Sequence, residues 1–412
     1  MTTEVVVLNR FGVAIAADSA ATVAHIHQNE RKQKVYNSAN KLFALSKYAP
    51  VGIVIFQSGA LGGLPWETIV KSYRKHLGRT VYDTLDQYCD DLFRWIESTP
   101  GLFDDAYVDA AIAEAAVTIL NNLGSGTPEE YGKRLSKRLT QQHSRAFIDG
   151  FDQSLMDELK VVHSKPIRDL VAQLPEDYRA GREEDLFNYV AESLGRTGAK
   201  LNSYSGVVVC GFGEREFYPR AVEYRTELIL LGRVRRARRK SYAISAETPS
   251  HIVPLADKEV IDTILDGISP SFSQAANTGA FELIASLPQT IISQIEELSQ
   301  DRKDHYINAA HPLVSTYLMR YLQGMSKFRE DHYSAPVKSV IASLPVSELG
   351  VVAETFLSVA QMHKKINPGA ETVGGPVDVA VISKGDGFIW IRRKHYFDRD
   401  LNPTFVARYF DP

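Results

Sequence analysis

The residues best suited to chemistry lie at the start of the chain, where MTTEVVVL places two threonines directly before an apolar run. A threonine hydroxyl is a weak nucleophile, but a threonine at a chain terminus carries its own base, the α-amino group. That amine has a pKa of about 7.7–8 in model compounds, and a nearby cation lowers this pKa further. Thr2 is therefore a candidate nucleophile once Met1 is removed. If Met1 is retained, the Thr2 nitrogen is an amide and cannot act as a base.

The elements that must position such a terminus are short apolar runs, including VVVL, GVAIAA, GIVIF, GVVVC and VDVAVI. They are apolar at nearly every position rather than at alternate positions, which is typical of strands buried on both faces. Helical spacing of apolar residues appears between these groups, as in WETIVKSYRKHL and SELGVVAETFLSVAQMHKKI. The order strands, helices, strands, helices, strands disfavours a regular βαβ repeat and predicts a layered α+β fold.

The bulk properties exclude several classes of protein. The chain has 412 residues, 44% hydrophobic and 24% charged, with a formal net charge of −3, so no general attraction to nucleic acid or membrane is expected. No apolar run approaches the ~20 residues of a membrane span, and the N-terminus does not resemble a signal peptide. Two separated cysteines, Cys89 and Cys210, fit a reducing compartment, so we expect a cytoplasmic protein.

Several segments resemble one family. TTEVVVLNRFGVAIAADSAAT resembles the start of mature proteasome β-subunits and of the related bacterial peptidase that works with an unfoldase. NKLFAL, SGALGG and VGGPVDVAVISKGDGFIWI resemble, in the same order, the family's lysine-bearing strand, its glycine loop and its closing strand pair. The resemblance implies a single N-terminal-nucleophile (Ntn) hydrolase domain, a four-layer αββα sandwich of two sheets between helix layers. It assigns a core of 2–80, 205–265 and 345–392, helical insertions at about 85–200 and 270–340, and an extension at 393–412.

The resemblance also implies a catalytic set of Thr2, Asp18 and Lys41, with Lys41 close to the threonine and Asp18 paired with Lys41. Taken alone, the position of Asp18 is typical of an aspartate in a turn after a strand. Lys34 competes with Lys41, because it follows Asp18 by 16 residues, the usual family spacing, whereas Lys41 follows it by 23. We favour Lys41, because it shares a strand face with the apolar residues at 43 and 45.

Further roles follow from the same resemblance. An oxyanion formed during acyl transfer needs preorganised N–H donors, and Gly59 in SGALGG is the best candidate, with Ser58 as the alternative. Either residue also fits a simple turn. Ala21 and Thr22 match positions that border the substrate cleft, where the Thr22 backbone would pair with an extended peptide.

The sequence departs from the family at its accessory residues. Leu255 stands where the family has one serine, and Val373 where it has another. Glu371 or Thr372 is a candidate accessory residue in place of the lost groups, and Asn367 is a further one. These departures put the activity in doubt but leave the Thr2, Asp18 and Lys41 set intact.

Two other charged patterns have simpler interpretations. The basic cluster GRVRRARRK, from Arg233 to Lys240, would suit nucleic acid or an acidic partner, but a solvated hairpin tip is the favoured reading. His25 and His27 lie in a polar stretch that reads as a loop insertion, and two loop histidines are more often solvated than bound to metal. We therefore expect no metal, no cofactor and no nucleic-acid partner.

Three functions remain open. The first is a proteasome-like threonine hydrolase that cleaves peptide bonds. The second is a catalytically inactive scaffold on the same fold, and the third is a small-molecule amidase. Self-association is expected by analogy with the family, and the absence of a Walker-type loop means that any ATPase must be a separate partner.

Overall fold

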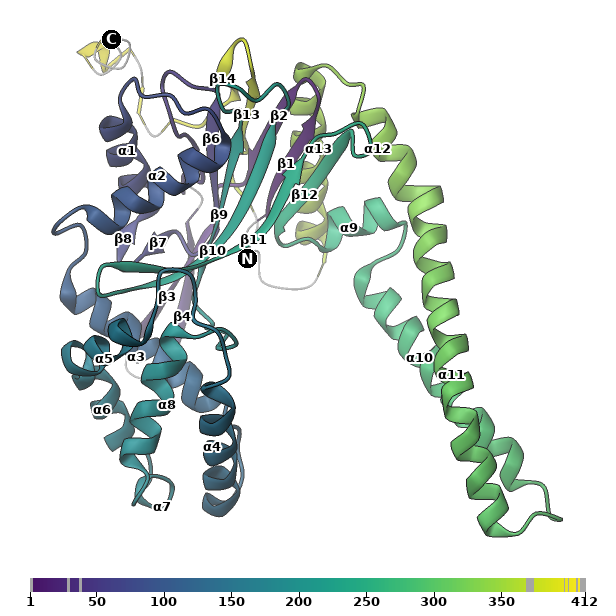
Figure 1. The fold of residues 1–412 in the computed structure, drawn as a ribbon. Helices are drawn as coiled ribbons and strands as arrows, with labels where there is room; N and C mark the ends of the chain where they lie inside the picture. The colour runs from purple at the N-terminus through teal and green to yellow at the C-terminus, as the bar shows by residue number, and fades with distance from the viewer. Residues whose placement is uncertain are drawn as a thin grey trace.

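The computed structural model describes residues 3–27, 30–36, 39–367, 374–395, 397–398, 400–404 and 407, with the side chains of 21–35 excepted. Within this part of the chain, the strands form two five-stranded antiparallel sheets and two short two-stranded sheets (Figure 1). The fold is thus a mixture of antiparallel sheets and many helices, as the strand and helix patterns predict.

The two large sheets draw their strands from distant parts of the chain. Sheet I contains, in spatial order, β12 (Ser250–Ala256), β1 (Thr3–Asn9), β2 (Gly12–Ala17), β13 (Asp378–Ser383) and β14 (Gly387–Arg392). Sheet II contains β11 (Arg233–Ala243), β10 (Arg220–Leu230), β9 (Ser205–Gly211), β6 (Val51–Gln57) and β5 (Leu42–Ala44). The small sheets pair β3 (Ala21–His27) with β4 (Glu30–Tyr36), and β7 (Ala60–Leu61) with β8 (Leu64–Pro65).

The helices lie in two long stretches of the chain and one shorter one. The first contains α1 (Trp66–Leu77), α2 (Leu85–Ser98), α3 (Asp105–Asn121), α4 (Pro128–Gln142), α5 (Gln153–Val162), α6 (Ser164–Ala172), α7 (Glu176–Arg179) and α8 (Glu183–Gly195). The second contains α9 (Glu259–Asp266), α10 (Pro270–Ser293) and α11 (Gln300–Arg329), and a π-helical turn (Glu330–Ser334) leads on to α12 (Ala335–Ile341). Helix α13 (Val346–Ile366) then precedes the final strands.

Alternation along β1 explains how sheet I is buried on both faces. Val6 and Leu8 join an apolar core that also contains residues of sheet II, whereas Val5 and Val7 join a second core with residues of α13. Every residue of β1 is buried. Sheet II buries its other face against α1, α2 and the helices that follow them. The two sheets therefore share a core, and each has helices on its opposite face.

The turn between β1 and β2 is fixed by specific contacts. The Asn9 side chain donates hydrogen bonds of 2.8 Å to the carbonyl oxygens of Ile341 and Leu344, which ties the sheet to the segment before α13. A Cβ on Gly12 would lie 2.4 Å from the carbonyl oxygen of Ile382, so the close approach of β13 requires glycine at this position. These contacts hold the first hairpin of the chain in the centre of sheet I.

Two expectations from the sequence are wrong in detail. The polar stretch that contains His25 and His27 is not a loop, because it forms the β3–β4 hairpin. The basic cluster is not a hairpin tip, because Arg233 to Lys240 lie within β11, the edge strand of sheet II. The tip itself is formed by Leu231 and Gly232, which both have positive φ. Among the described helices, none combines the length and apolarity needed to cross a bilayer.

Candidate active site

Asp18 lies directly after β2 and is held by two separate segments. Its backbone N–H donates to the carbonyl oxygen of Thr3 at 3.2 Å, and its Oδ2 accepts from the amide of Gly374 at 3.3 Å. The next residue, Ser19, donates its hydroxyl to the carbonyl oxygen of Pro376. The start of β1, the end of β2 and the segment before β13 therefore meet at this carboxylate, which is fully buried.

Lys41 reaches the same point from sheet II. It directly precedes β5, and its carbonyl oxygen accepts from the Ile55 amide at 2.9 Å, which fixes its backbone against β6. Its Nζ forms an ion pair with Asp18 and lies 3.1 Å from Oε1 of Glu4. Lys41 is only 7% exposed. The structure thus brings together Asp18 and Lys41, and adds a second carboxylate that the sequence analysis did not single out.

Glu4 was missed although the sequence carries a signal for it. It occupies the same face of β1 as Val6 and Leu8, the face that packs between the sheets, and it is fully buried. An acidic residue at such a position needs a cation beside it, because an unpaired buried charge is very costly. In the register of sheet I, Glu4 lies opposite Ala17 on one side and Leu255 on the other. Leu255, which stands where the family has an accessory serine, is therefore next to Glu4 in the sheet.

The titration of Asp18 follows from this burial. Burial raises the pKa of the Asp18 carboxyl above its ordinary value, and the neighbouring Lys41 offsets only part of that effect. A raised pKa in the folded state means that folding favours the protonated carboxyl. The free energy of unfolding is therefore expected to fall as the pH rises from the ordinary value of 3.8 through the raised value.

This gives a pH prediction for Asp18→Asn. The variant cannot titrate at this position, so its free energy of unfolding should lack the decline that the unchanged chain shows above the ordinary pKa of aspartate. Urea unfolding at a series of pH values between about 4 and 7 measures both slopes. Equal slopes for the two proteins would contradict the raised pKa.

The Ser58 side chain and backbone are already engaged. Its N–H donates to the carbonyl oxygen of Tyr204 at 3.1 Å. Its hydroxyl donates to the Ala60 carbonyl oxygen at 3.1 Å and accepts from the Ala60 amide at 3.3 Å. An oxyanion would therefore have to displace an existing partner of this amide.

Gly59 offers a different geometry. Its carbonyl oxygen accepts from the Trp66 amide at the start of α1, at 2.9 Å, whereas no hydrogen bond from its own amide is found within the described part of the chain. A Cβ on Gly59 would meet nothing within 4 Å. Gln57, two residues earlier, has φ of 65°, a conformation that non-glycine residues rarely adopt. The end of β6 is thus strained, and the exposed Gly59 that follows has open space at its Cβ position among the described residues.

The remaining candidates are placed as follows. Ala21 and Thr22 begin β3, and Thr22 pairs with Val35 of β4. Lys34 lies in β4 opposite Val23, in the small hairpin rather than in either large sheet.

Four other positions that the sequence analysis named lie outside the described residues, namely Thr2, Glu371, Thr372 and Val373. Asn367 directly follows α13, and its exposed side chain is 2.9 Å from a ring nitrogen of His363.

Four arginines of the basic cluster on β11 pair with acidic side chains, whereas Arg239 and Lys240 at its end are exposed. Arg233 and Arg236 both pair with Glu97 at the end of α2, and Arg238 pairs with Asp86 at 2.8 Å. Arg235 is 2% exposed and forms an ion pair with Glu227 of β10. These arginines fasten β11 to α2 and β10, which is a structural role.

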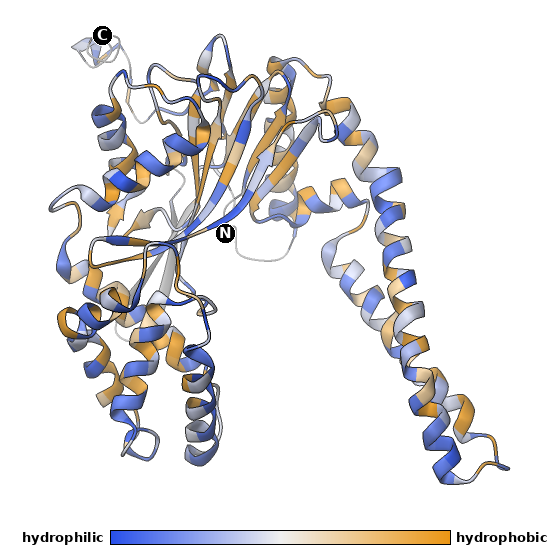
Figure 2. Ribbon diagram, in the orientation of Figure 1, coloured by the Kyte–Doolittle hydropathy of each residue, from blue (hydrophilic) through white to orange (hydrophobic). Residues whose placement is uncertain are grey.

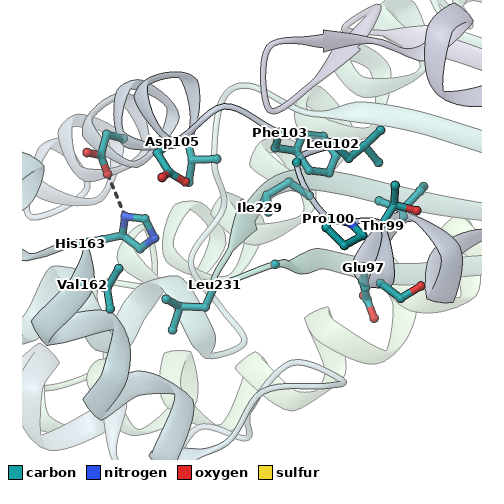
Figure 3. A pocket seen from close by; sticks show the side chains of 16 residues that line it. Glu97, Thr99, Pro100, Leu102, Phe103, Asp105, Val162, His163, Ile229 and Leu231 are labelled. Atoms are coloured by element: carbon teal, nitrogen blue, oxygen red, sulfur yellow. Dashed lines mark hydrogen bonds and ion pairs between the residues drawn. The ribbon is translucent and has the colours of Figure 1, made fainter.

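A separate cavity of about 570 Å³ lies between α2, α3, α5 and the β10–β11 turn (Figure 3). His163 and Asp109 form a pair there, with Nδ1 of the histidine 2.8 Å from Oδ1 of the aspartate. The hydroxyls of Ser98 and Thr99, which also line the cavity, donate instead to the Trp95 carbonyl oxygen. Neither of these two hydroxyls therefore donates to the His163–Asp109 pair. Within the described residues, no group of three or more potential metal ligands is found.

Comparisons with known proteins add little. No protein-family model matches the chain, and no curated protein matches it. A solved structure of a mutant of Anbu from Hyphomicrobium sp. strain MC1 is similar, with 12% identity, a TM-score of 0.28, and coverage of 99% of this chain and 94% of that chain. A TM-score this low carries no argument about fold or activity.

Proposed function

We propose that the chain is a proteasome-like threonine hydrolase that cleaves amide bonds, and that its sheets and outer helices form the four-layer αββα sandwich of Ntn hydrolases. The observation that supports this most is the buried cluster of Asp18, Lys41 and Glu4 beside the first described residue, Thr3. Thr3 is covalently joined to Thr2, the proposed nucleophile. Buried ion pairs contribute little to stability. A buried charge cluster at the start of the first strand is therefore better explained by a functional role than by packing.

The proposed reaction uses the chain's own groups. The Thr2 hydroxyl oxygen attacks the carbonyl carbon while the free Thr2 amine takes the hydroxyl proton. The oxyanion accepts a hydrogen bond from the Gly59 amide. The leaving amine departs with that proton and leaves an ester on the Thr2 oxygen. Water then adds to the ester and releases the carboxylic acid and Thr2.

Glu4 changes the electrostatics that the resemblance implies. Lys41 alone would lower the pKa of a neighbouring amine. With Glu4 and Asp18 ionised, two carboxylates surround one ammonium, so the cluster no longer carries a net positive charge. Such a cluster stabilises the ammonium that forms when the Thr2 amine takes the proton, much as the aspartate of a serine-protease triad stabilises its imidazolium.

The proposal requires that Thr2 become the first residue, and mass spectrometry tests this directly. We expect the intact mass to lack one methionine, and a β-lactone, which acylates hydroxyl nucleophiles, to add once per chain on the N-terminal peptide. A chain with a permanent N-terminal extension is the control, because its Thr2 nitrogen is an amide and it should not be labelled. Retention of Met1 in protein from its native host, or labelling only elsewhere, would exclude the Thr2 mechanism.

A second prediction concerns the open space at Gly59. Gly59→Ala should fold normally, with a change of no more than about 0.5 kcal/mol in the free energy of unfolding, because the added Cβ meets no neighbour among the residues that the structure describes. The methyl group would project into the space that the proposal gives to substrate, so kcat/KM should fall. Thermal unfolding and peptide hydrolysis measure the two effects. Unchanged kcat/KM would argue that substrate binds elsewhere.

An inactive scaffold is the second candidate, and one observation favours it. The fully buried Leu255 lies opposite Glu4, at a place where the resemblance expects a serine that assists the terminal amine. A chain that loses Met1 yet neither reacts with the β-lactone nor hydrolyses peptides would support the scaffold.

A further inference from the structure

The helices α10 and α11 form an antiparallel hairpin that projects away from the sheets (Figure 1). We call this hairpin, residues 270–329, the arm. At its base, Arg329 donates to the hydroxyl of Ser273 at 2.7 Å. At its far end, Lys303 donates to the carbonyl oxygen of Ser293 at 3.1 Å. The two helices are therefore joined near both ends of the arm, and the arm is attached to the body at one end (Figure 1).

The arm has the composition of a buried element, yet it is exposed. Neither helix contains a buried residue, although α10 has a single charged residue, Glu282. In α11 the stretch from 305 to 319 contains no Asp, Glu, Lys or Arg. Hydrophobic residues recur along both helices in Figure 2. A helix surface that faces water usually carries charged and polar side chains, and these two helices carry few charges.

Most exposed large apolar side chains of the arm fall into one stripe on each helix, whereas Phe281 and Met319 are exposed outside the stripes. On α10 the stripe consists of Phe272, Leu283, Leu287 and Ile291. On α11 they are Tyr306, Leu313, Tyr317, Tyr321, Met325 and Phe328. Most successive members are three, four or seven residues apart, which keeps them on one face of a helix. Each stripe remains exposed after the two helices have packed on each other, so it is available to a partner.

Charge is distributed unevenly between the two ends of the arm. The far end carries Glu296, Glu297, Asp301 and Asp304, with Arg302 and Lys303 as the only cations between residues 294 and 304. The last three turns of α11, near the base, carry Arg320, Lys327 and Arg329 and no acidic residue. The far end is thus net acidic and the last three turns of α11 are basic, while Glu330 and Asp331 follow directly in the π-helical turn.

We propose that the arm is a dimerisation surface, on which the arm of a second copy of this chain packs in antiparallel orientation to form a four-helix bundle. A two-fold axis places the acidic end of each arm against the basic end of the other, so one surface satisfies both apolar and charge complementarity. A different partner would have to match both the uncharged stripes and the end charges. This inference does not depend on the proposed catalysis.

The size of the surface is sufficient for a stable dimer. A 24-residue helix is about 36 Å long, and two adjacent helices present a face about 20 Å wide. The contact would then bury about 700 Å² on each copy, or about 1,400 Å² in total, within the range of specific interfaces. Knobs-into-holes packing of four helices with short connections is a common way to bury such stripes.

Sedimentation of the full chain tests the proposal. The unchanged protein should sediment as a dimer or a multiple of one. The variant Leu283→Gln/Leu287→Gln/Ile291→Gln should raise the dissociation constant by at least about tenfold, with thermal unfolding monitored to confirm the fold. The matched control is Val161→Gln/Val162→Gln, which alters exposed apolar residues at the end of α5 and should leave the mass unchanged.

A charge exchange tests the orientation. Arg320→Glu/Lys327→Glu should weaken the dimer, and adding Glu296→Lys/Glu297→Lys to the same chain should restore it, because opposite ends then attract again. A monomeric unchanged protein, or a triple glutamine variant with unchanged mass at every concentration, would overturn the proposal. Failure of the added lysines to restore the dimer would overturn the antiparallel arrangement.

Discussion

Replacing Thr2 by alanine is expected to lower amide hydrolysis by at least about 10³-fold, because loss of a nucleophile removes the covalent route. Thr2→Ser keeps a hydroxyl and an amine and should retain measurable turnover. Peptide hydrolysis and β-lactone labelling of the intact chain measure both effects. The folded structure should be unaffected, so the variants should unfold at the same temperature as the unchanged protein.

Thr3→Val is the matched control for this experiment. It removes the neighbouring hydroxyl while conserving shape, and the Thr3 carbonyl oxygen that accepts from the Asp18 amide remains. Hydrolysis should persist in this variant. Full activity of Thr2→Ala, or loss of activity in Thr3→Val with Thr2 intact, would show that the nucleophile is a different group.

Replacing Lys41 by methionine should lower the free energy of unfolding by about 3–5 kcal/mol, the usual cost of leaving a buried charge without its partner. Methionine fills a similar volume, so the loss is electrostatic rather than a cavity effect. Glu4 of β1 and Asp18, which directly follows β2 of sheet I, would then be left without the cation that reaches them from sheet II. The loss should be smaller at low pH, where the carboxyls bind protons. Urea unfolding at two pH values measures it.

Two comparisons make the Lys41 result specific. Lys71→Met alters a lysine of α1 that pairs with Glu67 but has a side chain 49% exposed, and exposed pairs contribute about 1 kcal/mol or less. The triple variant Glu4→Gln/Asp18→Asn/Lys41→Met removes all three charges, and it should be more stable than Lys41→Met alone. If the triple variant were less stable, the buried charges would not be the cause of the loss.

The sequence predicted the strands of the two large sheets better than it predicted the polar segments. The apolar runs that become β1, β2, β6, β9 and β13 are buried on both faces, because each strand lies between a shared core and a helix layer. By contrast, the Arg233–Lys240 cluster was read as a solvated tip, although it continues β11. Ion pairs with Glu97, Asp86 and Glu227 offset the charge there, and such long-range pairing is invisible to a local pattern.

The candidate site was also predicted only in part from the sequence. The structure places Lys41 between the sheets beside Asp18. The strand-face argument that favoured Lys41 over Lys34 is nevertheless wrong, because Phe43 and Leu45 pack on the opposite face of sheet II, against the helices. Glu4 was overlooked, because an apolar run follows it directly and its partner Lys41 is 37 residues away. Its location could be inferred only by asking which cation would accompany a carboxylate on the inner face of β1. The catalytic role of the cluster remains a prediction for the experiments above.

The position of β1 in sheet I also has a consequence for how the chain is made. Its neighbours are β2 and β12, and β2 in turn pairs with β13, so the first strand of the chain sits in a sheet whose last members are near residue 380. At a synthesis rate of about 5–20 residues per second, the ribosome needs about 20–75 s to deliver those strands. During that time the first hairpin presents unpaired edges and apolar faces on both sides. We therefore expect slow folding dominated by non-local pairing, and a nascent chain that depends on protection until its C-terminal segment emerges.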